Sequence, residues 1–260
     1  MSYSFLRQLL LLSLFASIGL VSCTRVENED SGDVNKGLFA YYPFSGNAYD
    51  ASGNGLHGEA LNGAKLTTDR NGRRNSAYYF DGVDDNIWTP LKDMSYSDQA
   101  SVCALIQPDN VTRNRYYNIC RQGPHHANFL LAFQEHGRIL SFGMFTGGSY
   151  QELDVAINPR DYTDDNWHCV SGVYDGNEMR LYVDGKLIGR TEKNGLIEKP
   201  GGSYIPIGSM VGRERFEGKI DDVRYYDRAI SVDEVREICN GSGNDDPTVP
   251  GADLGIDESL

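Results

Sequence analysis

The sequence predicts an all-β domain, in which two antiparallel sheets pack face to face and one short helix follows near the C-terminal end. The first observation is composition: the chain of 260 residues has 29 glycines and 16 tyrosines, which favours strands joined by many turns. The second is that Asp-Gly pairs separate short segments of alternating polar and apolar residues. The third is size, since roughly 200 residues lie between two polar tails, enough for one sandwich with a hydrophobic core.

An export signal precedes this domain in residues 1–22. Arg7 comes before an apolar run over residues 9–20, which is shorter than the roughly 20 residues of a membrane-spanning helix. Small residues and Cys23 then close the run, so the segment resembles a bacterial lipoprotein signal. The resemblance implies a lipid on Cys23 and anchoring at the outer membrane, with exposure on the cell surface. The alternative is an ordinary secretory peptide with an incidental cysteine.

Polar and acidic segments flank the domain on both sides. Residues 23–36 contain four acidic side chains and almost nothing to bury, which predicts a flexible tether. Residues 241–260 are again acidic, contain two prolines and show no periodicity, which predicts a disordered tail. The β-sandwich is therefore expected over residues 37–240.

The predicted strands alternate with turn sequences along the domain. An opening strand at residues 38–44 ends at Ser45-Gly46-Asn47. Over residues 167–190, two Asp-Gly turns divide three alternating segments, which predicts a meander because both turn residues tolerate positive φ. The other predicted strands cover residues 77–80, 101–107, 129–133, 138–142, 204–207 and 218–226.

One helix is expected after the last strand. Ser231 and Glu234 form the pattern of a capping box, in which each side chain bonds the other residue's backbone N–H. Val235 and Ile238 supply an apolar stripe at helical spacing. The sequence therefore predicts a short amphipathic helix that begins at residue 231.

The charge of the chain limits its partners. The formal net charge is −13 at pH 7. A surface of this sign repels phosphate backbones and anionic headgroups, which argues against nucleic acid and against electrostatic docking on membranes. Contact with the membrane is expected through the lipid anchor alone, and neutral glycans or proteins remain as partners.

Four cysteines follow Cys23, an even number that permits two disulfides in an exported protein. If residues 100–107 and 117–122 form a hairpin, Cys103 and Cys120 fall nearly opposite each other, which makes them a candidate pair. The alternative is that all four cysteines are free and buried as small apolar side chains. These four cysteines are Cys103, Cys120, Cys169 and Cys239.

Six segments in order resemble a laminin-G-like domain of the concanavalin A-like lectin and glucanase superfamily. The resemblance implies a jelly-roll β-sandwich over the whole domain and says less about function, because functional sites are grafted on folds. Two departures are Cys169, where the family often has histidine or valine, and Leu105, which replaces a common tryptophan. The six segments are residues 38–44, 50–58, 79–85, 166–170, 181–185 and 216–231.

The resemblance also implies a structural calcium ion, which takes several oxygen ligands. Asp221 is the expected carboxylate ligand, and Asp50 or the backbone around Gly46-Asn47 would complete the site. The alternative is that Asp50 and Asp81 are turn residues and that Asp221 pairs with an arginine. The run over residues 81–85 lacks the alternate ligand spacing and terminal glutamate of an EF-hand, which excludes that kind of site.

Catalysis is not expected. Glycoside hydrolases need two carboxylates that flank the scissile bond. Some members of the superfamily carry them on one strand, but the nearest match here, at residues 152–157, lacks the third carboxylate of that pattern. Nucleophile-elbow, zinc-protease and phosphate-loop motifs are also absent from the sequence.

Exposed aromatic side chains make glycan binding the first functional hypothesis. In the segment Asn86-Ile87-Trp88-Thr89, Ile87 should face the core, so Trp88 should project from the opposite face. Tyr116, Tyr117 and Tyr150 are expected on loops at which such sandwiches often bind. We therefore expect a non-catalytic, carbohydrate-binding surface lipoprotein, accessory to polysaccharide capture. The alternatives are that these rings only pack against neighbouring loops, and that the domain is an adhesion module for another protein.

Overall fold

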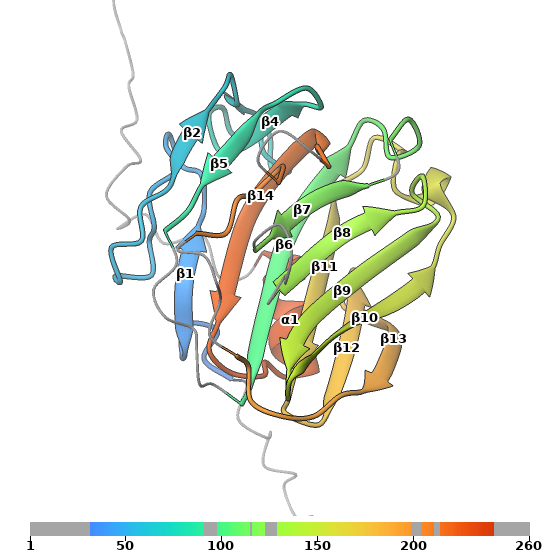
Figure 1. Cartoon of the computed structure of the whole chain (residues 1–260). Helices are drawn as coiled ribbons and strands as arrows, with labels where there is room; N and C mark the ends of the chain where they lie inside the picture. Colours follow the sequence, from blue (N-terminus) through green and yellow to red (C-terminus); the bar gives the residue numbers. More distant parts are fainter. Residues whose placement is uncertain are drawn as a thin grey trace, which may run out of the picture. The chain divides into compact units, whose positions relative to one another are not determined.

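Two antiparallel sheets face each other across the core in the computed structural model, which describes residues 32–90, 98–114, 116–122, 129–198, 204–210 and 214–241 (Figure 1). The predicted fold class, an antiparallel jelly-roll sandwich with one C-terminal helix, is confirmed. No helix within these ranges is long and apolar enough to cross a membrane. The predicted signal, Cys23 and most of the tether and the tail lie outside the described residues.

The first sheet has the strand order β13-β12-β11-β6-β14-β4-β3, and β1 also pairs with β14. Its long central strands come from opposite ends of the sequence, because β14 pairs with β6, β4 and β1. The strands are β1 (Leu38–Tyr42), β3 (Lys65–Thr67), β4 (Ala77–Asp81), β6 (Ala100–Pro108), β11 (His168–Tyr174), β12 (Glu178–Val183), β13 (Lys186–Glu192) and β14 (Glu217–Tyr226).

The second sheet has the order β10-β9-β8-β7, and the two-stranded pair β2-β5 extends it. Residues 204–208 join these two parts, because Ile207 exchanges backbone hydrogen bonds with Ile87 of β5 while Gly208 donates to Ile119 of β7. Figure 1 shows β7, β8 and β9 lying over β6 and β11. The strands are β2 (Glu59–Leu61), β5 (Asn86–Trp88), β7 (Tyr117–Arg121), β8 (Phe129–Gln134), β9 (Ile139–Thr146) and β10 (Ser149–Ala156).

The predicted meander is confirmed, and so is the turn chemistry at the second Asp-Gly pair, whereas at the first only Gly176 has positive φ (92°). Strands β11, β12 and β13 pair in sequence order, and Asp184 and Gly185, between β12 and β13, both have positive φ (49° and 73°). Only this backbone region gives a tight turn the twist of the strands that it connects, which explains the Asp-Gly pair.

Aromatic side chains fill the core between the sheets. Phe129 of β8 lies edge-on to Phe142 of β9 and to Tyr225 of β14, with ring centroids 5.8 Å apart in both pairs. Because Tyr225 belongs to the first sheet and Phe129 to the second, this cluster connects the two layers. Such edge-to-face pairs stabilise a fold by about 0.5–1.5 kcal/mol each beyond the burial of their area.

A second, smaller cluster lies on the outer side of the first sheet, under helix α1 (Val232–Asn240). The predicted capping box is present, since Ser231 accepts from the Glu234 N–H and Glu234 accepts from the Ser231 N–H. Val235 and Ile238 are buried against Tyr182 and Tyr226 of the sheet. The helix ends at Gly241, whose φ of 82° suits glycine.

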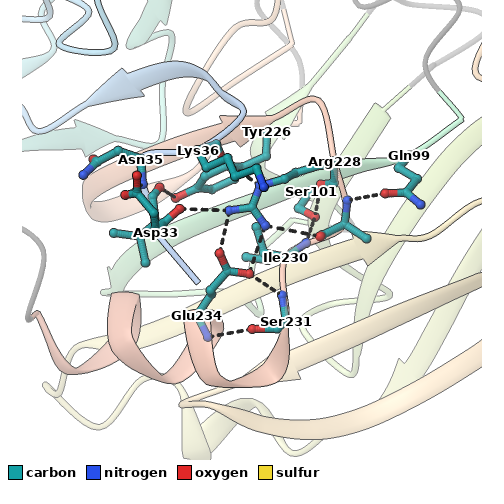
Figure 2. Close-up of polar contacts among 12 residues, drawn as sticks. Asp33, Asn35, Lys36, Gln99, Ser101, Tyr226, Arg228, Ile230, Ser231 and Glu234 are labelled. Carbon is teal, nitrogen blue, oxygen red and sulfur yellow. Dashed lines mark hydrogen bonds and ion pairs between the residues drawn. The ribbon is translucent and has the colours of Figure 1, made fainter. Parts of the chain in front are cut away.

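Arg228 ties the first described residues to this helix (Figure 2). Its guanidinium donates to both carboxylate oxygens of Glu234, at 2.9 and 2.5 Å, and to the backbone carbonyls of Lys36 and Asp33, at 2.7 and 3.2 Å. Val34 is buried in the same cluster under α1. The predicted end of the tether at residue 36 is therefore wrong, because residues 32–36 pack as part of the domain.

The structure contains the disulfide Cys169–Cys239, and Cys103 and Cys120 are free and buried. The predicted Cys103–Cys120 bridge is wrong because β6 and β7 form no hairpin: they belong to different sheets. Cys103 faces the cluster under α1, whereas Cys120 faces the main core. The observed bridge explains why Cys169 departs from the family pattern, since it fixes the end of α1 to β11.

Candidate functional site

The outer face of the second sheet carries the exposed aromatic side chain that the sequence singles out. Ile87 of β5 is completely buried in the core, and Trp88 therefore projects to the opposite face, as predicted. The same alternation holds in residues 204–208, where Ile205 and Ile207 are buried. Tyr204 is consequently turned to the same side as Trp88.

Trp88 and Tyr204 form a stacked pair on this face. Their ring centroids are 4.1 Å apart and the ring planes differ by 21°. The pairing of β5 with residues 204–208 holds the two rings in place, because the Ile205 N–H donates to the Thr89 carbonyl at 3.0 Å. Trp88 keeps 38% of its surface exposed. The pair thus presents a pre-positioned aromatic surface to solvent.

Sequence reasoning named Trp88 but missed Tyr204. The predicted strand at residues 204–207 contained the signal, since a tyrosine that alternates with two isoleucines should face away from the core. The pairing of these two strands could not be predicted from the sequence, because it joins residues more than 100 positions apart.

Tyr150 lies on the same sheet, on strand β10 rather than on the expected loop. Its hydroxyl donates to the Glu152 carboxylate at 2.6 Å, and Gln134 Nε2 donates to the other oxygen of Glu152 at 2.7 Å. The ring lies across Gly143 of β9, where a Cβ atom would fall 2.3 Å from the Tyr150 hydroxyl. Burial and the contact with Glu152 raise the pKa of Tyr150, so its hydroxyl stays a neutral donor.

Further polar groups follow the register across this sheet. Arg121 of β7 lies opposite Leu130 of β8, which lies opposite Gly143 of β9. Arg121 pairs with Glu214 at 2.5 Å, and Asn118 Nδ2 donates to the same carboxylate at 3.0 Å. The outer face of this sheet therefore carries fixed carboxylates and amides as well as the exposed ring of Trp88, and both kinds of group suit a hydroxyl-rich ligand.

Tyr117 does not share this arrangement with Trp88. Tyr117 is completely buried in the core, and its hydroxyl accepts a hydrogen bond from the Asn114 N–H at 2.7 Å. The prediction of Tyr117 as a ligand contact is therefore wrong, because it begins strand β7 with its side chain turned inward. Tyr116, directly before that strand, is half-buried.

A family model described as the concanavalin A-like lectin/glucanases superfamily matches residues 81–236. The chain belongs to this superfamily. No curated protein matches the sequence. The match covers the strands from the end of β4 to β14 and most of α1, and therefore includes Trp88, Tyr150 and Tyr204.

Solved structures with the same fold are binding domains. The chain is 15% identical to the binding domain of Paraclostridial Mosquitocidal Protein 1, with a TM-score of 0.67, covering 82% of this chain and 54% of that one. It is 18% identical to domain 4 of AbnA, an extracellular arabinanase of Geobacillus stearothermophilus solved with arabinotriose (TM-score 0.62, 78% and 98% covered). It is 14% identical to the binding domain of botulinum neurotoxin DC solved with SialylT (TM-score 0.64, 80% and 52% covered).

At these identities the likeness shows the fold alone. The chain spans about half the length of the two toxin domains. It spans almost the whole of the arabinanase domain. The laminin-G-like domain is thus comparable in extent to a single lectin-like module.

The calcium ligands expected from the superfamily do not fit an ion in this arrangement. The Asp50 carboxylate already accepts four hydrogen bonds, from the Tyr41, Ser52 and Leu56 N–H groups and the Ser52 hydroxyl, at 2.9–3.0 Å. These fill its lone-pair positions and organise the loop after β1, which is the turn role given as the alternative. Asp221 is buried, and its Oδ1 already accepts the Asp222 N–H at 2.7 Å.

The carboxylates of the sequence motif at residues 152–157 are engaged by their neighbours. Glu152 accepts from Tyr150 and Gln134, and Asp154 accepts from the Ser141 hydroxyl at 2.6 Å. Both lie on β10, toward the outer face that carries Trp88. The arrangement can bind hydroxyl groups by donating and accepting hydrogen bonds beside the sheet.

Proposed function

We propose that this domain binds a glycan on the outer face of its second sheet and does not cleave it. The observation that carries the proposal is the stacked pair of Trp88 and Tyr204, which leaves the Trp88 ring open to solvent. An aromatic ring can cover the apolar face of a sugar, and a ring that is already held in place loses little conformational entropy on binding.

The polar groups of the same sheet supply the second part of the argument. Gln134, Tyr150 and Glu152 form a hydrogen-bonded set on β8 and β10, at the opposite end of the sheet from Trp88, so a glycan that contacts both must be an extended chain. Groups fixed in this way can read the positions of sugar hydroxyls, which gives orientation and specificity in a mostly apolar site. Asp154 and Glu152 are used here as hydrogen-bond acceptors rather than as an acid and a nucleophile.

The structural neighbours support this class of ligand. The arabinanase domain was solved with arabinotriose, and one of the neurotoxin domains was solved with SialylT. The same neurotoxin DC binding domain was also solved with rat synaptotagmin II, which is a protein partner. Binding of a protein is therefore the second candidate function, favoured by that complex.

Substitution of Trp88 tests the proposed function. The purified protein is first screened on a glycan array, and the affinity for the best glycan is then measured by calorimetry. The Trp88→Ala variant should bind at least about tenfold more weakly, a loss of roughly 1.4 kcal/mol, because the stacking surface is gone. The matched control is Leu187→Ala, which removes an exposed apolar side chain from β13 of the other sheet and should leave the affinity unchanged.

Two results would count against glycan binding at this face. The first is a Trp88→Ala variant that binds the array glycan as tightly as the parent does, which would place the ligand elsewhere. The second is an array with no bound glycan, together with one surface protein that co-purifies with the domain and is released by Trp88→Ala. That outcome would replace the glycan with a protein ligand at the same rings.

We also propose that the domain is held at the outer membrane by a lipid on Cys23 and serves polysaccharide capture at the cell surface. The support is the order of Arg7, the apolar run and Cys23 in the sequence. Acyl chains anchor a protein at about 0.8 kcal/mol for each buried methylene, so several chains give a stable anchor.

Mass spectrometry of the protein isolated from its own cells tests the anchor. The N-terminal peptide should begin at Cys23 and carry the added mass of acyl chains. A Cys23→Ser variant should lose this mass and leave the membrane fraction, because the thiol that carries the lipid is absent. Recovery of the parent protein with an unmodified Cys23 would refute the proposal.

A further inference from the structure

The turn between β4 and β5 gathers three carboxylates. Asp81 ends β4, and Asp84 and Asp85 precede β5. One carboxylate oxygen from each of the three residues lies within 4.8 Å of the other two. At this spacing the three negative charges repel one another. Exposed acidic groups are common in proteins, so a second observation is needed before the group can be called a binding site.

Unsatisfied buried oxygens provide that evidence. Asp85 is only 3% exposed, and while its Oδ2 accepts from the Asp81 N–H at 2.9 Å, its Oδ1 is buried without a hydrogen-bond partner. Asn86 is 4% exposed and its Oδ1 is also buried without a partner, although its Nδ2 donates to the Asp84 carbonyl at 3.1 Å. Buried acceptors with no donor cost free energy, and such groups call for a ligand.

The charges around the cluster leave it negative. Arg113 is paired with Glu217 at 2.8 Å, and Glu217 lies directly opposite Asp81 on β14. A bound cation would relieve the repulsion among the carboxylates and complete the coordination of the buried oxygens.

Two neighbouring turns fix the geometry of the cluster. The Val83 N–H donates to Asp81 Oδ1 at 2.7 Å, which holds that carboxylate over the turn. From the turn between β2 and β3, Asn62 Nδ2 donates to the Asp84 carbonyl at 3.1 Å. Gly63 follows with a φ of 121°, and a Cβ atom there would lie 3.0 Å from Asp85 Oδ1. A glycine at this position therefore keeps the space beside the buried oxygen open.

We propose that Asp81, Asp84 and Asp85, with the side-chain oxygen of Asn86, bind a hard divalent cation of the size of Ca²⁺. All the donors are oxygens, and Ca²⁺ accepts irregular sets of carboxylate and amide oxygens that the stricter octahedron of Mg²⁺ does not. The site differs from an EF-hand because its carboxylates are adjacent in sequence and because a second turn closes it. It is also distinct from the pair Asp50 and Asp221 that the family resemblance implies.

Calcium titration of the chelator-treated, purified protein tests the site. We expect saturable heat on addition of Ca²⁺ alone in calorimetry, with weaker binding of Mg²⁺. At a Ca²⁺ concentration 100-fold above the dissociation constant, the thermal midpoint should rise by about 5–10 °C, because the ion binds only the folded state.

Asp84→Asn is the decisive variant. The Asp84 side chain is exposed, and the hydrogen bonds to this residue from Asn62 and Asn86 use its backbone carbonyl, so the fold should persist. Its Ca²⁺ affinity should fall at least about tenfold, in line with the loss of a coordinating group. The matched control is Glu192→Gln, an exposed acidic residue of β13, which should bind Ca²⁺ as the parent does.

Three results would overturn the proposal. The first is the absence of heat and of any thermal shift with Ca²⁺ up to about 10 mM, far above the dissociation constants of extracellular calcium modules. The second is an Asp84→Asn variant that binds Ca²⁺ with the parent's affinity. The third is a loss of binding in Asp221→Asn while Asp84→Asn is unaffected, which would assign the ion to the other carboxylates.

Discussion

At the scale of single residues, the register of a strand decides which aromatic side chains can reach a ligand. Trp88 and Tyr117 were both expected at the surface, yet the first stacks on Tyr204 in the open and the second is completely buried. Ile87 made the direction of Trp88 predictable, because a buried neighbour in a strand forces the next residue outward. Tyr117 was expected on a loop, and the alternation of side chains along a strand does not apply to a loop residue.

His168 shows how a residue without a sequence motif acquires an electrostatic role. Its Nδ1 lies 3.1 Å from the Asp184 carboxylate and its Nε2 lies 3.1 Å from the Asp164 carboxylate. Two acceptors require both ring nitrogens to carry protons, so the imidazolium form is favoured and the pKa of His168 is raised, chiefly by Asp184. Hydrogen bonds from Asn166 and then from His168 lower the pKa of Asp164 to about 2.

These shifts predict a pH dependence of stability. A raised histidine pKa stabilises the fold at pH values below about 6.5, and the effect disappears as the pH rises through the folded-state value. A lowered carboxylate pKa stabilises it above about pH 4, and the effect disappears as the pH falls toward 2. Near pH 5, the free energy of unfolding of the parent should therefore exceed that of a His168→Gln variant by about 1 kcal/mol. This difference should shrink at lower and at higher pH.

Denaturant unfolding of both proteins between pH 2.5 and 9 measures this difference. The variant removes the charge but keeps a hydrogen-bonding side chain of similar length, so it reports on the ion pairs rather than on lost volume. A difference between parent and variant that stays constant over the whole range would contradict the assignment.

At the scale of elements, two contacts at opposite ends fix helix α1 on the first sheet. Arg228 binds Glu234 in the first turn of the helix (Figure 2). The disulfide joins Cys239, near the end of the helix, to Cys169 of β11. The helix has nine residues, a length at which an isolated helix is marginal in water, so its stability depends on these contacts and on the buried stripe of Val235 and Ile238.

Removal of the disulfide should weaken the whole fold. The bridge spans 70 residues, and loss of a cross-link over such a distance increases the entropy of the unfolded chain. We expect the Cys169→Ala/Cys239→Ala double variant to lose about 2–4 kcal/mol of unfolding free energy. Urea unfolding of the parent and the double variant, each with and without reductant, measures this loss.

The reductant provides the internal control for that experiment. It should destabilise the parent to the level of the double variant and leave the double variant unchanged, because Cys103 and Cys120 are free. Equal destabilisation of both proteins by the reductant would show that another bridge contributes.

At the scale of the whole molecule, local sequence signals predicted most of the fold. Alternating segments and Asp-Gly turns located the meander of β11, β12 and β13, and the capping box located α1, since both depend on neighbours within a few residues. The layer in which each strand lies is a long-range property. Strands β6 and β7 are consecutive in the chain but belong to opposite sheets. The prediction of a disulfide between them was wrong for this reason.

The candidate sites divide in the same way. Trp88 was predictable from a single strand, whereas its partner Tyr204 depends on a pairing across more than 100 residues. The calcium ligands were expected at Asp50 and Asp221 by resemblance, but hydrogen bonds occupy the first, and the second is buried and accepts the Asp222 N–H. The orphaned oxygen of Asp85 cannot be recognised from a sequence, because it depends on which donors fail to reach it.

The contacts of Arg228 with the Asp33 and Lys36 carbonyls determine how the domain can be presented. They fasten the start of the domain to the layer that bears α1, and Gly241 closes the helix on that layer too. Both ends of the described domain therefore lie on the side of the sandwich that carries α1, opposite the sheet with the exposed indole of Trp88.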